Sequence, residues 1–169
     1  MDTFEAIRTL LAVRAFRDAP VPEDVVREIV EAGHLTASAG NGQPWHFIVV
    51  QDKDTLRQLG VLSPSGRYIA QAQLAVVVAT DANSAYGVSD ASRAIQDMLL
   101  AAWSRGVGGN WVGARDAAAI KPVLGIPEGV DLLAIVPFGY PAQSVGAGKK
   151  QRKPLGEVAS RERFGQPFA

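Results

Sequence analysis

Three short apolar runs constrain the fold of this chain more than any other feature of its 169 residues. They span residues 45–51, 74–79 and 131–140, and each has the length of one buried β-strand. Because the first run is apolar without alternation, we expect a sheet that is covered on both faces. The runs by themselves allow a doubly wound α/β sheet as well as an α+β arrangement.

Segments with helical spacing of apolar residues separate these runs. We expect helices over residues 2–11, 22–34, 89–105 and 116–124, and a shorter one that starts at residue 52. In the first helix, Phe4, Ile7 and Leu11 would form the apolar face. Ser89 would cap the long helix and Gly106 would end it. That long helix is apolar on more than one side, which is typical of a central helix or of one shared with a second subunit.

Composition argues against several classes of function. Lys+Arg and Asp+Glu both number 17, so the formal net charge is zero, which argues against nucleic acid or an anionic membrane as a partner. The chain has no cysteine, and its two histidines, His34 and His46, lack the helical spacing of metal ligands. We therefore predict no metal site. With an acidic N-terminus that does not resemble a signal peptide, we expect one soluble cytoplasmic domain over residues 1–169.

The segment Ala37–Phe47 brings turn-forming residues and side-chain amides directly before the first apolar run. Two glycines within three positions permit a left-handed backbone, and Pro44 sets an extended entry into the strand. The side-chain amides of Asn41 and Gln43, with exposed backbone amides beside them, suit a planar ligand with a polar edge. The alternative is an ordinary connection between a helix and a strand.

Two further segments have both a functional and a purely structural interpretation. Three glycines within four positions at 106–109 indicate a tight turn, with Trp111 buried, or a close approach to a flat group. No strand precedes them, so they are not a dinucleotide fingerprint. The basic run 149–153 is either a solvated surface or a site for a phosphate. A glycine-rich linker, residues 142–148, precedes it, and the tail after it must bury Val158 and Phe164.

Together these motifs resemble those of the nitroreductase-like flavoproteins. Residues 37–47 are similar to the family's Pro-Ser-(Ser/Ala)-x-Asn-x-Gln-Pro-Trp-x-Phe, with Ala37 in place of the proline. Residues 106–113 are similar to Gly-Leu-Gly-x-x-Trp-x-Gly, and residues 150–154 to Lys-x-Arg-x-Pro. The resemblance implies an α+β fold with a mainly antiparallel sheet of four or five strands and helices on both faces. It also implies an intertwined homodimer with two flavins at its interface, the tail 142–169 packing on the partner.

The resemblance also implies which residues hold the FMN cofactor. Residues of the amide-rich segment contact it, the tryptophan segment flanks its ring and directs a backbone amide to N5, and basic residues bind its phosphate. Polar residues before the second strand, with Ser65, Arg67 and Tyr68 as candidates, would contact the pyrimidine edge. The sequence gives no reason to name a catalytic acid or base, and solvent could deliver the proton. The predicted cofactor-binding residues are Arg14, Ser38, Ala39, Asn41, Gln43, Trp111, Val112, Gly113, Lys150 and Arg152.

One departure from the family lies at residues 10–16, where relatives typically show Arg-x-Ser-x-Arg/Lys-x-Phe. Leu10 and Ala12 replace two polar ligands with groups that cannot donate a hydrogen bond. The loss of two such partners weakens phosphate binding by about 3–5 kcal/mol. Arg8 would compensate if the first helix continued to Ala12, and would otherwise be a solvated charge.

The activity implied by the resemblance is that of an FMN-dependent oxidoreductase. NADH or NADPH would deliver hydride to flavin N5, and a nitroaromatic compound, a quinone or a similar small molecule would accept it. Two alternatives remain open: a flavin-binding or scavenging dimer with weakened affinity, and an enzyme that breaks down the flavin itself.

Overall fold

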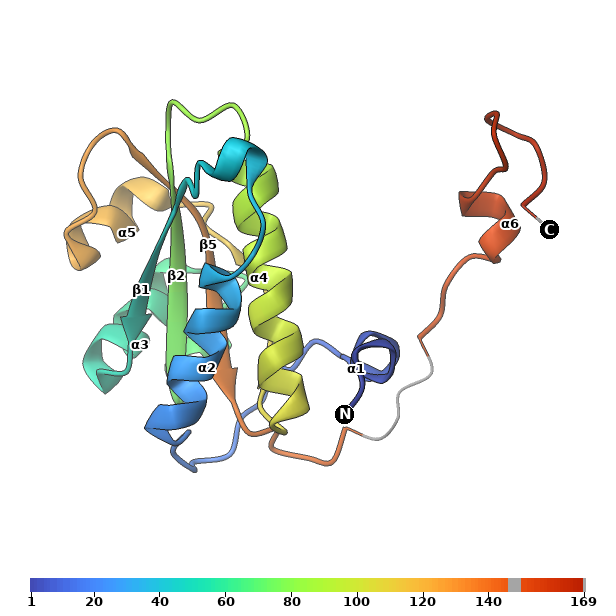
Figure 1. Cartoon of the computed structure of the whole chain (residues 1–169). Helices are drawn as coiled ribbons and strands as arrows, with labels where there is room; N and C mark the ends of the chain where they lie inside the picture. The colour runs from blue at the N-terminus through green and yellow to red at the C-terminus, as the bar shows by residue number, and fades with distance from the viewer. Residues whose placement is uncertain (146–149, 169) are drawn as a thin grey trace.

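The computed structural model describes residues 1–145 and 150–168 (Figure 1). Among these residues, five antiparallel strands form one sheet in the order β1-β2-β5-β3, with β4 also paired to β5. The strands are β1 (Trp45–Val50), β2 (Leu74–Asp81), β3 (Gly108–Gly109), β4 (Val112–Gly113) and β5 (Val130–Gly139).

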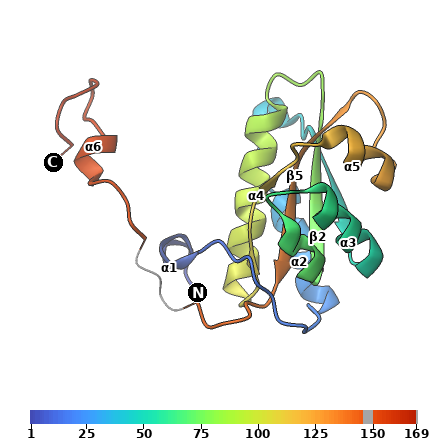
Figure 2. The same ribbon diagram turned by 180° about the vertical axis from the view of Figure 1, so that it is seen from behind.

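Helices cover both faces of this sheet. The described chain has the helices α1 (Thr3–Thr9), α2 (Glu23–His34), α3 (Lys53–Leu62), α4 (Gly87–Ser104), α5 (Ala117–Leu124) and α6 (Leu155–Val158), with 3-10 turns η1 (Ala39–Asn41) and η2 (Arg67–Gln71), and the faces of the sheet are covered by α2, α3, α4 and α5. Figure 1 shows α2 and α4 in front of the sheet, and Figure 2 shows α3 and α5 on the opposite face. The all-antiparallel pairing confirms the α+β arrangement and excludes the doubly wound sheet.

The central strands are buried on both faces, as the apolar runs predicted. Every residue of β2 except the last is buried. Val76 and Val78 pack in the cluster under α2 and α4, while Val77 packs in the cluster under α3 and α5. The expectation is wrong for β1, where His46 is exposed and Val49 is 38% exposed. Among the described residues, β1 has a neighbouring strand on one side only, so it is less enclosed.

The first helix is shorter than predicted. Asp2 caps it by accepting a hydrogen bond from Glu5 N at 3.0 Å, and the helix ends at Thr9. Two residues of its predicted apolar face are not packed within the described chain, since Phe4 is 74% and Ile7 is 48% exposed, while Leu11 lies beyond the helix and is half-buried. The buried side is instead Ala6 and Thr9.

The long helix also starts earlier than predicted. α4 begins at Gly87, and Ser89 lies inside it, where its hydroxyl donates to Tyr86 O at 3.0 Å instead of capping an amide. Gly106 ends the helix, as predicted, with φ at +74°. The predicted cap of α5 is confirmed, because Asp116 accepts from Ala119 N.

The C-terminal segment extends away from the sheet and its helices in both views (Figures 1 and 2). Val158 is 65% exposed and Phe164 is fully exposed, so neither is buried by its own chain. Residues 146–149, which include part of the predicted linker and the first lysine of the basic run, lie outside the described residues. Within 1–145 and 150–168, no helix combines the length and apolar character needed to cross a bilayer.

Candidate functional site

The amide-rich segment folds into a short strained loop between α2 and β1. Gly40, Asn41 and Gln43 all have positive φ, at +57°, +56° and +46°. The left-handed region is uncommon for residues other than glycine and costs free energy. The loop therefore needs fixed contacts to keep this shape.

Internal hydrogen bonds supply part of that restraint. Ser38 Oγ accepts from Gln43 N at 2.9 Å, Asn41 N donates to Ser38 O at 3.0 Å, and Gly42 N donates to Ala39 O at 3.0 Å. These backbone amides are thus engaged within the loop, so the prediction that they are exposed to a ligand is wrong. The groups that face solvent are the side chains of Asn41 and Gln43.

A buried carboxylate on α4 supplies the remaining restraint. The side chain of Asp90 is 1% exposed, and its Oδ2 accepts from Ala39 N at 3.0 Å. Its Oδ1 accepts from the guanidinium of Arg93. Burial alone would raise the pKa of Asp90, but the hydrogen bonds from Ala39 N and Arg93 outweigh burial and lower the pKa below its ordinary value.

Arg14 lies on a different part of the molecule, beside β3. Val13 N donates to Gly109 O at 3.0 Å, so the chain around Arg14 runs along the β3 edge of the sheet. Val13 is buried, whereas the side chain of Arg14 is exposed to solvent.

Gly108 and Gly109 are explained by packing within the chain. A Cβ on Gly108 would lie 2.3 Å from Val13 Cγ2, and one on Gly109 would lie 2.8 Å from Leu99 Cδ2. Both positions therefore require glycine for contacts with the protein's own side chains.

Gly113 on β4 has a different environment. A Cβ built there meets no atom of the described chain within 4 Å, although neighbouring Val112 is 2% exposed. Trp111 is 38% exposed, which contradicts the interpretation of this segment as a turn around a buried tryptophan. The edge of β4 therefore offers open space next to an aromatic side chain.

The segment before β2 adjoins this edge. A Cβ on Gly66 would lie 2.5 Å from Val112 Cγ1, and the Tyr68 hydroxyl accepts a hydrogen bond from Asn110 Nδ2. Residues 66–68 and 110–112 are thus neighbours. No local sequence pattern predicts the Tyr68–Asn110 contact, because it joins positions 42 residues apart.

Of the two predicted basic residues of the C-terminal motif, Lys150 contacts α1. Lys150 Nζ donates to Ile7 O, and Arg152 Nη1 donates to Gln151 O at 2.8 Å. Partial burial and the charge of Arg152 both lower the pKa of Lys150. Arg8 is not a substitute phosphate ligand, since the helix ends before Ala12 and Arg8 pairs with Glu5 at 2.8 Å.

A single chain does not bring all ten predicted residues together. The amide-rich loop enters β1 at one edge of the sheet, while β4 forms the other edge. Three strand spacings separate these edges, or about 14 Å at the usual spacing between strands. Within one chain, the loop and β4 therefore lie at opposite edges of the sheet.

The chain is similar to known proteins along most of its length. The sequence profile described as Nitroreductase family matches residues 8–73 and 64–140. A protein of Methanothermobacter thermautotrophicus, provisionally named NADH dehydrogenase/NAD(P)H nitroreductase, is 35% identical over 154 residues, which are 86% of this chain and 81% of that protein.

Solved structures share the fold. A crystal structure with the same provisional name, from Bacteroides thetaiotaomicron, has a TM-score of 0.88 at 28% identity and covers 96% of this chain and 98% of its own. A provisionally named nitroreductase from Desulfovibrio desulfuricans, solved in complex with FMN, has a TM-score of 0.85 at 31% identity and covers 97% of this chain and 98% of its own. The predicted fold is therefore confirmed.

Proposed function

Because this chain belongs to the nitroreductase family, we propose that it passes hydride from NADH or NADPH, through N5 of bound FMN, to a small acceptor such as a nitroaromatic compound or a quinone. It is an NAD(P)H-dependent oxidoreductase with FMN as its cofactor. The acceptor and the roles of individual residues are the parts that the proposal adds.

The observation that carries the proposal is the open edge of β4. A Cβ built on Gly113 would meet no atom of the described chain within 4 Å, and Trp111, two residues before it, is 38% exposed. A planar ring system fits such an edge, because it needs close approach to backbone and an aromatic neighbour. Tyr68 and Asn110, hydrogen-bonded to each other, would border it.

The phosphate of FMN would be bound by cations from both ends of the chain. Arg14 is exposed on the β3 edge, Lys150 contacts α1, and Arg152 lies near Lys150. Three cations suit a dianionic phosphate, and arginine binds phosphate oxygens in a bidentate manner. In this arrangement the side chains orient the cofactor, and no side-chain acid or base is required of the protein.

The remaining contacts would come from a second copy of the chain. Ser38, Ala39, Asn41 and Gln43 lie at the sheet edge opposite β4, so they would meet the ring bound at a partner's β4 edge. The exposed apolar residues Phe4, Ile7 and Phe164 fit the same homodimer, since a partner would cover them. A cytoplasmic location stays a prediction.

One observation favours a second candidate, a dimer that binds or scavenges flavin with reduced affinity. Leu10 and Ala12 offer no hydrogen-bond donor from their side chains, and Arg8 is engaged with Glu5. Phosphate binding would then depend on the three cations alone.

The visible spectrum of the purified protein tests these alternatives. A yellow protein whose flavin band is bleached anaerobically by NADH or NADPH supports the oxidoreductase. Flavin that binds but is not reduced by either nucleotide supports the scavenger. A protein that stays colourless in excess FMN contradicts both. Analysis of the flavin after aerobic turnover tests the breakdown activity, and we expect it to be recovered intact.

A further inference from the structure

Asp90 makes a contact that an ordinary helix-terminal aspartate does not make. It lies in the first turn of α4, yet its Oδ2 accepts from Ala39 N, which is 51 residues away in the sequence. Its other oxygen is bound by Arg93, one turn further along the same helix. A buried carboxylate with a cation and an amide as partners keeps its charge, because both partners favour the ionised form.

The loop that Asp90 holds is the strained one. Ala39 is the first residue of η1, and three of the next four residues, Gly40, Asn41 and Gln43, are left-handed. The other hydrogen bonds described for this loop connect its own residues with one another and do not attach it to α4 or the sheet. They involve Ser38, Ala39, Asn41, Gly42 and Gln43. Asp90 therefore connects this loop to the rigid body of the molecule, and such strain persists only where surrounding contacts determine it.

We propose that Asp90 is a positioning residue, which fixes the loop Ser38–Gln43 through Ala39 N so that the side chains of Asn41 and Gln43 are presented to the flavin ring. This inference rests on the proposed function, because it assumes that the loop contacts bound flavin. Preorganisation lowers the entropy lost when a ligand is bound. The loop thus binds with its strained backbone already in place.

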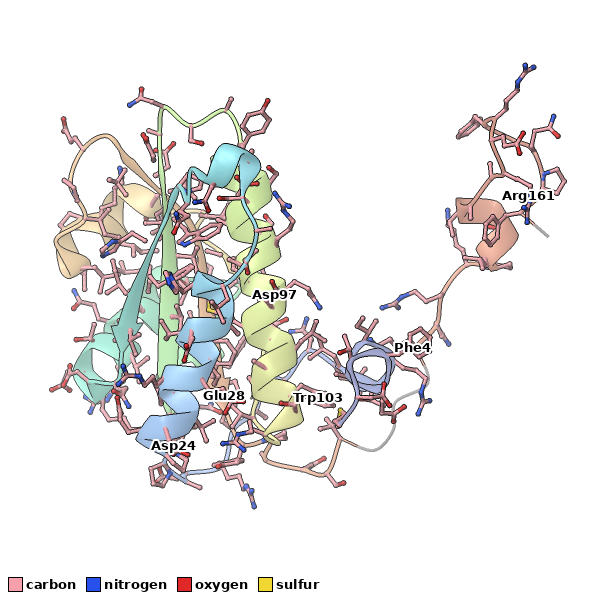
Figure 3. All side chains as sticks on the ribbon, in the orientation of Figure 1. Phe4, Asp24, Glu28, Asp97, Trp103 and Arg161 are labelled. Carbon is pink, nitrogen blue, oxygen red and sulfur yellow. The ribbon has the colours of Figure 1, made fainter. Side chains whose placement is uncertain are left out.

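A matched aspartate on the same helix provides the control. Asp97 also accepts a hydrogen bond from the connection after α2, since Thr36 Oγ1 donates to its Oδ2 at 2.6 Å. Figure 3 shows Asp97 on the middle of α4. Thr36 precedes the strained loop, and no backbone amide of that loop is bonded to Asp97 in the part of the chain that the structure describes. The two positions thus separate a loop contact from a general contribution to helix packing.

The first experiment compares FMN titrations, followed by flavin fluorescence, of the wild type, Asp90→Asn and Asp97→Asn. We expect Asp90→Asn to weaken FMN binding about tenfold, because the ionised acceptor of Ala39 N becomes a neutral amide and the bond to the loop loses its charge assistance. We expect Asp97→Asn to bind like the wild type. Equal FMN affinity of Asp90→Asn and the wild type would overturn the inference while leaving the proposed function intact.

A second variant removes the same hydrogen bond from the loop side. Ala39→Pro deletes the donating N–H at the first position of η1, and Ser38 before it has extended φ and ψ of −129° and 157°, which proline tolerates in a preceding residue. The double variant combines Asp90→Asn with Ala39→Pro. If Asp90 acts through Ala39 N, its FMN affinity is no lower than that of whichever single variant binds FMN more weakly. Additive losses would mean that the two residues act separately and would overturn the inference.

A loss of FMN affinity can be told apart from a loss of stability in Asp90→Asn. Circular dichroism and thermal unfolding measure the folded fraction, and FMN affinity is then compared for folded protein only. A wild type that binds no FMN would instead overturn the proposed function and this inference together.

Discussion

Trp103 Nε1 donates a hydrogen bond to Thr9 Oγ1 at 2.9 Å, and this contact joins α1 to the end of α4 across 94 residues of sequence. Both side chains are buried, and Figure 3 shows Trp103 at the end of α4 that faces α1. α1 in turn supplies Ile7 O to Lys150 Nζ. The position of one phosphate-binding candidate therefore depends on this buried pair.

Thr9→Val should destabilise the protein by about 1–3 kcal/mol, because the buried indole N–H of Trp103 loses its acceptor while the volume of the side chain is kept. Urea denaturation monitored by circular dichroism measures this change. Thr9→Ser is the control, since it keeps the hydroxyl and should retain most of the stability. If Thr9→Val unfolds like the wild type, the hydrogen bond does not anchor α1.

Arg152→Ala should weaken FMN binding by more than about tenfold, because one cation at the phosphate is removed. Riboflavin lacks the phosphate, so its affinity should change little. Arg8→Ala is the control, since Arg8 is an exposed charge paired with Glu5. An FMN titration of Arg152→Ala that matches the wild type would refute the phosphate role of Arg152.

Local chemistry made several elements predictable from sequence. Asp2 and Asp116 cap their helices by accepting from the amide three residues later, which is a short-range relationship that a sequence displays. The buried strands β2 and β5 follow from unbroken apolar runs. The prediction that Ser89 caps α4 is wrong, because the helix already begins at Gly87. The Ser89 hydroxyl donates to the carbonyl of Tyr86 instead.

Contacts between residues far apart in the chain cannot be predicted from local sequence patterns. The Asp90–Ala39 bond joins residues 51 positions apart, and only the folded chain brings them together. The helical spacing of apolar residues predicts an apolar face that includes Phe4, but it does not say whether the same chain or another molecule covers that face. The prediction of exposed backbone amides in the loop is wrong for a related reason, because these amides donate hydrogen bonds to acceptors within the loop.

The charge of Asp90 makes part of the stability depend on acid pH. Its pKa is lowered in the folded protein, so its contribution is fully present above the unfolded value of about 3.9 and is lost as the pH falls through the folded value. Thermal unfolding between about pH 5 and pH 3 should therefore show a steeper loss for the wild type than for Asp90→Asn, which has no carboxylate to protonate there. Asp52, whose pKa is also lowered, chiefly by the backbone amide of Thr55, remains in both proteins and cancels in the comparison. Parallel curves would contradict the assigned role of the Asp90 charge.

Gly113→Val should abolish FMN binding without unfolding the protein. A Cβ at Gly113 meets nothing within 4 Å, and valine is favourable in a strand, so we expect stability within about 0.5 kcal/mol of the wild type. Gly109→Val is the contrasting variant, because its Cβ would lie 2.8 Å from Leu99 Cδ2 and the overpacking should cost about 1–3 kcal/mol or more. Denaturation curves of both variants show which glycine is needed for packing within the protein. FMN titrations show which glycine is needed for binding the ligand. A Gly113→Val protein that binds FMN and turns over normally would show that the ring does not lie along β4.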